Sequence, residues 1–270
     1  MEYKNIGFTI SKLRKCGNQE KFLSSYGYQL IENFSDLKKK KIDLLFVLGG
    51  DGFMLRVLHK AMNTNVHFFG VNCGTNGFLL NNPKYLFEND LESLIKNSQK
   101  YIINPLKAKI ISSNGVVKIT HAINEISLLR STHNTSHIKI LIDDEERLDN
   151  LIGDGIIAAT PVGSTAYNLS LNGPILPLNS NFLAITPISP FRPRLWKGAI
   201  VNDSKKITFE VNENHIRPVN VTADFLEFRN VAKVEIITDK SREINMLFNT
   251  FENIDEKIIG QQFHSDCQFL

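Results

Sequence analysis

Apolar runs alternate with helical patterns along the first hundred residues. Residues 6–10, 42–48 and 66–71 are short and mostly apolar, and residues 53–62 have the apolar spacing of one helical face. Mostly apolar runs are typical of strands that are buried on both faces of a sheet. Strands that alternate with helices favour parallel pairing, with the helices on the faces of the sheet. The pattern therefore predicts an α/β domain at the start of the chain.

A different pattern begins after Pro105. Short β-like segments follow one another, and turn-forming residues separate several of them, as at residues 113–115. Such spacing is typical of an antiparallel sheet or a sandwich. One predicted helix after Pro161 interrupts the strands, and residues 247–259 again have helical spacing. The predicted β segments are 106–112, 116–123, 138–142, 151–159, 207–211, 219–222 and 231–238.

These patterns divide the chain of 270 residues into three parts. Residues 1–104 form the predicted α/β domain, and residues 105–246 form a β-rich domain. Residues 247–270 form a C-terminal helix and tail, which we expect to pack back on the first domain. Two domains also agree with the length, since a domain has on average roughly 150 residues.

Composition and charge limit the possible functions. With 42% hydrophobic residues, 22% charged residues and a formal net charge of +3, the chain is typical of a globular protein. So small a net charge does not indicate nucleic-acid binding. No apolar stretch approaches the roughly 20 residues that span a bilayer, and residues 1–10 lack the apolar core of a signal peptide. We therefore expect a cytoplasmic protein that binds neither nucleic acid nor membrane.

The three cysteines, Cys16, Cys73 and Cys267, show no metal-binding or redox spacing. None belongs to a CxxC pair or to a Cys/His ligand pattern. Cysteines of cytoplasmic proteins are mostly kept reduced. The prediction is therefore three reduced thiols.

The strongest local feature is the turn Gly49-Gly50-Asp51-Gly52, between a predicted buried strand and a predicted helix. Glycines allow a tight turn and let an anion approach the backbone N–H groups, and a helix N-terminus attracts phosphate. An aspartate would repel phosphate, but it can accept a proton or hydrogen bond from a nearby hydroxyl. The alternative is an ordinary turn with Asp51 as the N-cap of the helix.

Two familiar phosphate-binding patterns are absent from this turn. It is not a GxGxxG fingerprint, and no GK[ST] follows, so the sequence indicates neither a Rossmann dehydrogenase nor a P-loop NTPase. A second glycine-bearing loop, residues 70–78, follows the next predicted strand. Both loops would open at the carboxyl ends of parallel strands, where open α/β sheets bind ligands.

Three further strings lie in the β-rich part of the chain. They are Asn124-Glu125, Gly153-Asp154-Gly155, and residues 160–170, which contain Thr-Pro-Val-Gly-Ser-Thr-Ala-Tyr. Ser164 lacks the GxSxG frame of a hydrolase nucleophile. The hydroxyl groups, the N–H groups and the Tyr167 ring of residues 160–170 could hold a polar aromatic ligand. Taken singly, each string is also consistent with a purely structural role.

Together, and in this order and approximate spacing, the four strings resemble those of the bacterial ATP-dependent NAD kinase family. The resemblance covers nearly the whole chain from Ile6, and residues 172–176 and 186–190 extend it. The string at residues 160–167 is its most specific element. The resemblance implies a Rossmann-like three-layer N-terminal domain and a β-sandwich-type C-terminal domain.

The resemblance also implies an activity. Members of the family are transferases that move the γ-phosphoryl of ATP to the 2′-hydroxyl of the adenosine ribose of NAD, which yields NADP. By resemblance, Asp51 orients that hydroxyl and accepts its proton, and Gly49, Gly50 and Gly52 line the phosphate-binding turn. Mg²⁺ or another divalent cation would accompany ATP, and no protein ligand for it is identified.

Further residues carry NAD-binding roles by resemblance. Asn124 and Glu125 would hold the ribose of NAD, and Asp224 would lie near the same pocket. Asp154 would reach the nucleotide of a neighbouring subunit, which implies a homodimer or homotetramer with sites completed across the interface. The residues that would grip a nucleoside are Val162, Thr165, Ala166, Tyr167, Asn168 and Ser170.

The chain departs from the family pattern at Phe53, Ile152, Phe191 and Phe225. Residues 74–77, Gly-Thr-Asn-Gly, are similar to an element of diacylglycerol and sphingosine kinases. The alternative enzyme is a lipid kinase of the diacylglycerol type, which also combines a Gly-Gly-Asp-Gly turn with a β-rich second domain. A non-catalytic NAD-binding regulator is a third possibility, although an aspartate beside phosphates would bring it little. The sequence leaves open the phosphoryl donor, the choice between NAD and NADH, feedback by NADP or NADPH, and the oligomeric state.

Overall fold

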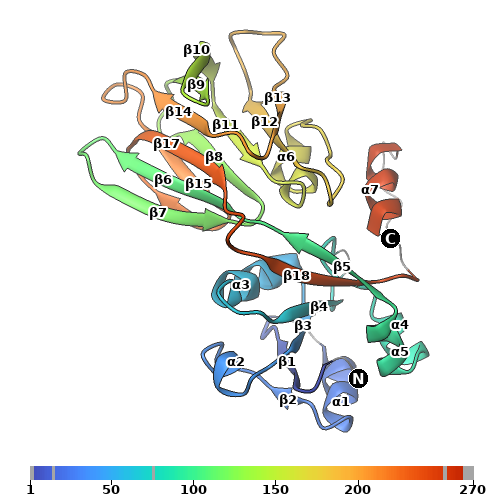
Figure 1. Cartoon of the computed structure of the whole chain (residues 1–270). Helices are drawn as coiled ribbons and strands as arrows, with labels where there is room; N and C mark the ends of the chain where they lie inside the picture. Colours follow the sequence, from blue (N-terminus) through green and yellow to red (C-terminus); the bar gives the residue numbers. More distant parts are fainter. Residues whose placement is uncertain (1–2, 14–15, 75–76, 252–253, 264–270) are drawn as a thin grey trace. The chain divides into compact units, whose positions relative to one another are not determined.

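The computed structural model describes residues 3–13, 16–74, 77–251 and 254–263. The chain forms two compact units, Met1–Ile103 with Arg242–Leu270, and Asn104–Ser241 (Figure 1). The units therefore change between residues 103 and 104 and between residues 241 and 242. The sequence placed these boundaries at 104/105 and 246/247.

The first unit is built on a six-stranded sheet with the order β2-β1-β3-β4-β18-β5. All neighbours in it are parallel except β18 and β5, which are antiparallel. Strand β3 is buried along its whole length, as its apolar sequence predicts. The strands are β1 (Ile6–Ile10), β2 (Gln29–Leu30), β3 (Leu44–Gly49), β4 (His67–Asn72), β5 (Ser98–Ile103) and β18 (Ile244–Asn249).

Helices connect these strands. Helix α3 buries Met54, Val57, Leu58 and Ala61, which recur at the spacing of one helical face. This confirms the helix predicted at residues 53–62, with a start two residues earlier. The helices of the unit are α1 (Gly17–Ser25), α2 (Asp36–Lys39), α3 (Asp51–Ala61), α4 (Lys84–Glu88), α5 (Leu91–Lys96) and α7 (Ile254–Phe263).

The helix predicted at residues 247–259 is wrong over its first part. Residues 244–249 form strand β18, and α7 begins only at Ile254. β18 pairs with both β4 and β5 and buries Met246 and Leu247. A short apolar run cannot be assigned to helix or strand from its spacing alone. Here the run forms a strand because it pairs with an edge of β4 and an edge of β5.

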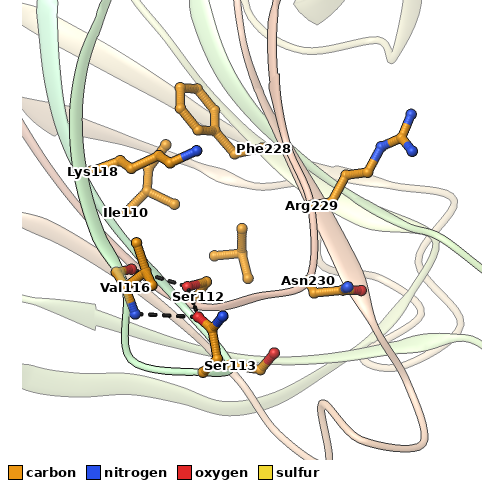
Figure 2. Close-up of a pocket in the computed structure, with 10 residues that line it drawn as sticks. Ile110, Ser112, Ser113, Val116, Lys118, Phe228, Arg229 and Asn230 are labelled. Atoms are coloured by element: carbon orange, nitrogen blue, oxygen red, sulfur yellow. Dashed lines mark hydrogen bonds between the residues drawn. The ribbon is translucent and has the colours of Figure 1, made fainter.

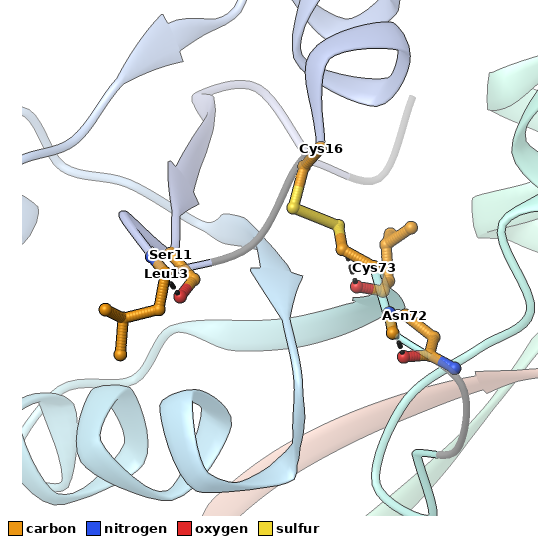
Figure 3. Close-up of a disulfide and its surroundings, with 7 residues drawn as sticks. Ser11, Leu13, Cys16, Asn72 and Cys73 are labelled. Carbon is orange, nitrogen blue, oxygen red and sulfur yellow. Dashed lines mark hydrogen bonds between the residues drawn. A yellow bond between two sulfur atoms is a disulfide. The ribbon is translucent and has the colours of Figure 1, made fainter.

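The prediction of three reduced thiols is also wrong. Cys16 and Cys73 form a disulfide, with 5.5 Å between their Cα atoms (Figure 3). Cys16 directly precedes α1, and Cys73 directly follows β4. The two residues are 57 positions apart, so their proximity arises from the packing of α1 against the sheet and leaves no local spacing to recognise. Cys267 lies outside the described residues.

The second unit is a sandwich of two six-stranded antiparallel sheets. One has the order β10-β9-β14-β17-β6-β7, and the other has the order β13-β12-β11-β8-β15-β16. The first sheet contains β6 (Leu106–Ser112), β7 (Val117–Ala122), β9 (Ser136–Ile142), β10 (Glu145–Gly153), β14 (Ile207–Val211) and β17 (Val231–Thr238). The second contains β8 (Glu125–Arg130), β11 (Gly155–Ala159), β12 (Phe182–Ile188), β13 (Ala199–Asn202), β15 (Val219–Ala223) and β16 (Leu226–Phe228).

One apolar core joins the two sheets of the sandwich. Alternate residues such as Ile126 and Leu128 of β8 point into it, together with Ile140 and Phe209 from the opposite sheet. This alternation is the period-2 pattern of a half-buried strand. The mixed α/β fold class and the β-sandwich are thus confirmed. The stretch 151–159, predicted as one strand, is divided at Asp154 into the end of β10 and all of β11.

The interruption predicted after Pro161 is present in a reduced form. It consists of a 3₁₀ turn, η1 (Gly163–Thr165), and one helical turn, α6 (Tyr167–Ser170). Within the part of the chain that the structure describes, no helix is both long and apolar enough to cross a bilayer.

Candidate active site

Asp51 is the first residue of α3 and follows the carboxyl end of β3. Its Oδ2 atom accepts a hydrogen bond from the N–H of Phe78 at 2.8 Å, and its Oδ1 atom accepts one from the N–H of Leu79 at 2.9 Å. The N-cap of α3 is Gly50, and no side chain caps the helix. The alternative role of Asp51 as an N-cap is therefore wrong, and its carboxylate instead holds the segment that follows the next strand.

The electrostatic environment of Asp51 makes its carboxylate a stronger base than that of an ordinary aspartate. Burial of the carboxyl raises its pKa, while the N–H groups of Phe78 and Leu79 and the charge of Lys257 lower it, and the net direction is upward. Each carboxylate oxygen can accept more than one hydrogen bond, so both retain capacity for a ligand hydroxyl. A partly buried carboxylate with such capacity is suited to accept a proton.

The glycines of the turn differ in what surrounds them. A Cβ atom at Gly49 would come within 2.8 Å of the Phe53 ring, so Phe53 packs where a side chain at position 49 would lie. A Cβ at Gly50 or Gly52 would meet nothing within 4 Å. The backbone of Gly50 and Gly52 is thus open to a ligand. Phe53, where the chain departs from the family pattern, packs inside the turn.

The two glycine-bearing loops start side by side, as predicted. Gly49 of β3 is in register with Asn72 of β4. The N–H of Cys73 donates to the carbonyl of Gly49 at 2.9 Å, and the N–H of Gly74 donates to Oδ1 of Asn72 at 2.9 Å. Residues 75–76, which carry part of the similarity to lipid kinases, lie outside the described residues.

In the second unit, Asp224 holds the start of strand β8. Its carboxylate accepts hydrogen bonds from the N–H groups of Ile123 at 2.6 Å, Asn124 at 2.8 Å and Glu125 at 3.2 Å. Asp224 has a φ of 51°, a left-handed conformation that Asp tolerates better than most residues. The next residue, Phe225, is 47% exposed. The side chain of Asp224 therefore fixes the backbone that carries Asn124 and Glu125.

Two side-chain atoms beside Asp224 are buried without a hydrogen-bond partner, Oδ1 of Asn124 and Oε2 of Glu125. Burial and, second, the charge of Asp224 raise the pKa of Glu125 to about 8. Glu125 is thus mostly protonated at pH 7 and can both donate and accept. Leaving a buried polar group unpaired costs about 1–3 kcal/mol, which is typical of a site built for a ligand.

The string at residues 160–167 is attached directly to this pair. Oγ1 of Thr160 donates to the carbonyl of Ile123 at 2.7 Å, and the N–H of Thr160 donates to the carbonyl of Asn124 at 2.9 Å. A Cβ at Gly163 would lie 2.1 Å from the carbonyl oxygen of Asn124, so only glycine permits this approach. The structure therefore brings two strings that are far apart in the sequence into contact.

The predicted nucleoside-gripping residues differ in accessibility. Tyr167 and Ser170 are exposed, Thr165 and Ala166 are half-buried, and Val162 is buried. Asn168, which was also predicted, is buried, and its side chain and that of Ser164 form hydrogen bonds within the protein. The Ser164 hydroxyl donates to the Pro161 carbonyl at 2.6 Å and accepts from the N–H of Leu176 at 2.9 Å. The amide of Asn168 donates to Ser164 and Pro174 and accepts from Thr186.

Asp154 lies between β10 and β11, and Arg130 pairs with it through a short hydrogen bond from Nε to Oδ1. Arg130 could not be recognised from the sequence, because 24 residues separate it from Asp154. The backbones of Ile152 and Phe191, two of the departures from the family pattern, also meet, since the N–H of Phe191 donates to the carbonyl of Ile152 at 2.7 Å.

A cavity of about 490 Å³ lies elsewhere in the second unit, between the β6–β7 turn and the β16–β17 turn (Figure 2). Lys118 and Phe228 line it, with the Lys118 ammonium 5.8 Å from the centre of the Phe228 ring. None of the predicted site residues lines this cavity. Among the described residues, no three His, Cys, Asp or Glu side chains cluster so as to hold a metal ion.

The chain joins an α/β unit to a β-sandwich, and solved structures share this fold. The chain has the fold of yeast NADH kinase, crystallised with NADH, with a TM-score of 0.80 and 21% identity over 98% of this chain and 89% of that chain. It has the same fold as an Archaeoglobus fulgidus NAD kinase in complex with ATP, with a TM-score of 0.75 and 23% identity over 96% and 98%. The chain thus shares its fold with these two kinases.

The chain belongs to the NAD kinase family. The ATP-NAD kinase N-terminal domain matches residues 4–99, and the ATP-NAD kinase C-terminal domain matches residues 123–248. The NAD kinase of Rickettsia rickettsii is 42% identical over 84% of this chain and 88% of its own length. That of Xylella fastidiosa is 41% identical over 87% and 89%. The enzyme is thus an NAD kinase, and neither matching domain describes a lipid kinase.

Proposed function

We propose that this enzyme transfers the γ-phosphoryl of ATP to the 2′-hydroxyl of the adenosine ribose of NAD, and that Asp51, Asn124 and Glu125 carry the reaction. The observation that carries the proposal is the pair of buried atoms without partners, Oδ1 of Asn124 and Oε2 of Glu125. Vicinal hydroxyl groups of a ribose offer two adjacent donors and acceptors. Such groups would satisfy both atoms and remove the energetic cost of leaving them unpaired.

Asp51 serves as the proton acceptor in this proposal. The ribose 2′-oxygen attacks the γ-phosphorus, the bond from that phosphorus to the bridging oxygen of ADP breaks, and the hydroxyl proton passes to the Asp51 carboxylate. A carboxylate is far too weak to deprotonate a ribose hydroxyl beforehand. Phosphoryl transfer through a loose transition state requires little from the nucleophile until late, so a well-placed carboxylate suffices.

The phosphates of ATP would approach the open backbone of Gly50 and Gly52 at the start of α3. Backbone N–H groups at a helix N-terminus bind phosphate without a cationic side chain. The negative charge of Asp51 opposes such binding, and Mg²⁺ held by the ATP phosphates would offset it. We therefore propose that Mg²⁺ or another divalent cation enters with ATP as part of the substrate.

The exposed ring of Tyr167 would stack on a base of the dinucleotide, beside Thr165, Ala166 and Ser170. Val162 and Asn168 are buried, so we assign them to the support of this segment. Asp224 contributes through the backbone of Asn124 and Glu125.

We also propose a homodimer or homotetramer in which Asp154 reaches the nucleotide of a neighbouring subunit. Within one chain, Asp154 is paired with Arg130, so a ligand would meet the pair and not an isolated carboxylate. A cytoplasmic location is part of the same proposal. Cell fractionation tests it, and the Cys16–Cys73 disulfide makes that test informative, since disulfides are rare in the cytosol.

A coupled assay of NADP formation tests the reaction, with wild type and Asp51→Asn each given NAD and either ATP-Mg²⁺ or polyphosphate. We expect wild type to form NADP with ATP, and Asp51→Asn to bind NAD and lose about 10²- to 10⁴-fold in kcat. EDTA should abolish the ATP-dependent rate. Near-normal turnover of Asp51→Asn would refute the proton-acceptor role, and phosphorylation of diacylglycerol in place of NAD would refute the proposed substrate.

A further inference from the structure

One cation of helix α7 acts on the segment that Asp51 holds. Nζ of Lys257 donates a hydrogen bond to the carbonyl of Leu80 at 3.2 Å. The two residues before Leu80 are Phe78 and Leu79, whose N–H groups donate to the Asp51 carboxylate. The cation and the carboxylate therefore contact the same three-residue segment.

That segment is closely packed against its neighbours in the sheet. A Cβ at Gly70 would come within 2.6 Å of the Leu80 side chain and 2.9 Å of the Leu79 carbonyl, which leaves no room between the segment and β4. The next residue, Asn81, donates through Nδ2 to the carbonyls of Gly70 and Leu247. The segment is thus bound both to β4 and to β18, and Lys257 attaches α7 to it.

The charge of Lys257 also distinguishes it from everything else described around Asp51. The turn between β3 and α3 contributes glycines, the Phe78–Leu80 segment contributes apolar side chains, and Cys73 is in a disulfide that does not titrate. The other titratable side chain described on α7, Glu256, is exposed. The charge of Lys257 lowers the pKa of Asp51, against the larger effect of burial, which raises it.

We propose that Lys257 is a positioning residue of this kinase, which attaches α7 to the Phe78–Leu80 segment and places a positive charge on the segment that holds the Asp51 carboxylate. The proposal rests on the role of Asp51 as proton acceptor. Its physical content is that an ionised, fixed carboxylate accepts the ribose proton, whereas a protonated carboxyl cannot.

The sign of the effect follows from the charge. A neighbouring cation favours the ionised form of a carboxyl, so its removal raises the pKa of Asp51 further. At acidic pH a smaller fraction of the enzyme then has an ionised Asp51. The acidic limb of the profile of kcat against pH therefore moves to higher pH. A purely structural contact would lower the rate equally at every pH.

Three variants separate these cases. Lys257→Gln keeps a hydrogen-bond donor for Leu80 and removes the charge, Lys257→Arg keeps both, and Lys96→Met at an exposed position of α5 is the matched control. NADP formation is measured from pH 5 to pH 9, together with the KM for NAD and the thermal midpoint. For Lys257→Gln we expect the acidic limb of the kcat profile to move to higher pH, so that kcat falls more at pH 6 than at pH 8, with little change in the KM for NAD. Lys257→Arg and Lys96→Met should follow the wild-type profile.

A wild-type profile for Lys257→Gln, or a loss that is uniform with pH and accompanied by a lower thermal midpoint, would overturn the proposal. Failure of Lys257→Gln to fold would count against it as well, because the variant keeps the hydrogen bond. Asp51→Asn is assayed in parallel. If Asp51→Asn remains active, the proton-acceptor role itself is wrong. If Asp51→Asn loses activity and Lys257→Gln behaves like wild type, only the proposed role of Lys257 is wrong.

Discussion

Replacement of Glu125 by Gln should stabilise the folded protein above about pH 5, and the stabilisation should grow as pH rises to about 8. Burial, and second the charge of Asp224, raise the pKa of Glu125 to about 8 from an ordinary value of 4.5. Between these two values the folded state binds more protons than the unfolded state, so the free energy of unfolding falls as pH rises. Gln resembles the protonated acid in shape and cannot ionise.

The size of this stabilisation follows from the difference between the two pKa values. From 4.5 to about 8, at about 1.36 kcal/mol per pH unit, full ionisation of Glu125 destabilises the folded state by about 5 kcal/mol. At pH 4 the acid is neutral in both states, and the penalty is close to zero. We therefore expect Glu125→Gln to match wild type at pH 4 and to exceed its free energy of unfolding by about 3–5 kcal/mol at pH 9.

Urea unfolding at pH 4, 7 and 9 measures this difference, with the fluorescence of Trp196 as the probe. Trp196 is the single tryptophan and packs against the core of the sandwich unit that carries Glu125. The matched control is Glu145→Gln, an exposed glutamate at the start of β10, which should change the stability by less than about 0.5 kcal/mol at every pH. A difference between Glu125→Gln and wild type that does not grow with pH would refute the reasoning.

Two further predictions concern packing and the disulfide. Gly163→Ala places a Cβ atom 2.1 Å from the carbonyl oxygen of Asn124, so we expect a destabilisation of about 2 kcal/mol or more and weaker NAD binding. Thermal unfolding measures the stability, and titration with NAD measures the binding. Wild-type values for both would contradict this prediction. Reduction of the Cys16–Cys73 disulfide, which links residues 57 positions apart, should lower the free energy of unfolding by about 4 kcal/mol. Unfolding with and without dithiothreitol measures it, and Cys16→Ser, which lacks the disulfide, should show no response to the reductant.

Much of the fold could be predicted because it rests on local patterns. The apolar run of β3 and the alternation in strands such as β8 each follow from which faces of a strand are buried. β18 was missed because its place is decided by the free edges of β4 and β5, which no local window contains. The Cys16–Cys73 disulfide was missed for the same reason, since the packing of α1 alone brings the two residues together.

The candidate site likewise has features that local sequence predicts and features that depend on long-range contacts. The strings around Asp51, Asn124 and Tyr167 could be found from the sequence because each is a compact combination of turn, hydroxyl and acidic residues. The contacts that give these residues their properties are long-range. Phe78 reaches Asp51 across 27 residues, and Asp224 reaches Asn124 across 100 residues. A sequence can therefore name such residues without showing what holds them.

The two aspartates illustrate what those contacts mean for mutagenesis. Asp51 and Asp224 each use their carboxylate to hold consecutive backbone N–H groups, two in one case and three in the other. A substitution that removes the carboxylate thus leaves N–H groups without an acceptor, at about 1–3 kcal/mol for each that stays buried, whatever it does to the chemistry. An alanine at either position confounds the two effects. The isosteric asparagine keeps one acceptor oxygen, so a loss of turnover in Asp51→Asn at unchanged stability isolates the chemical role.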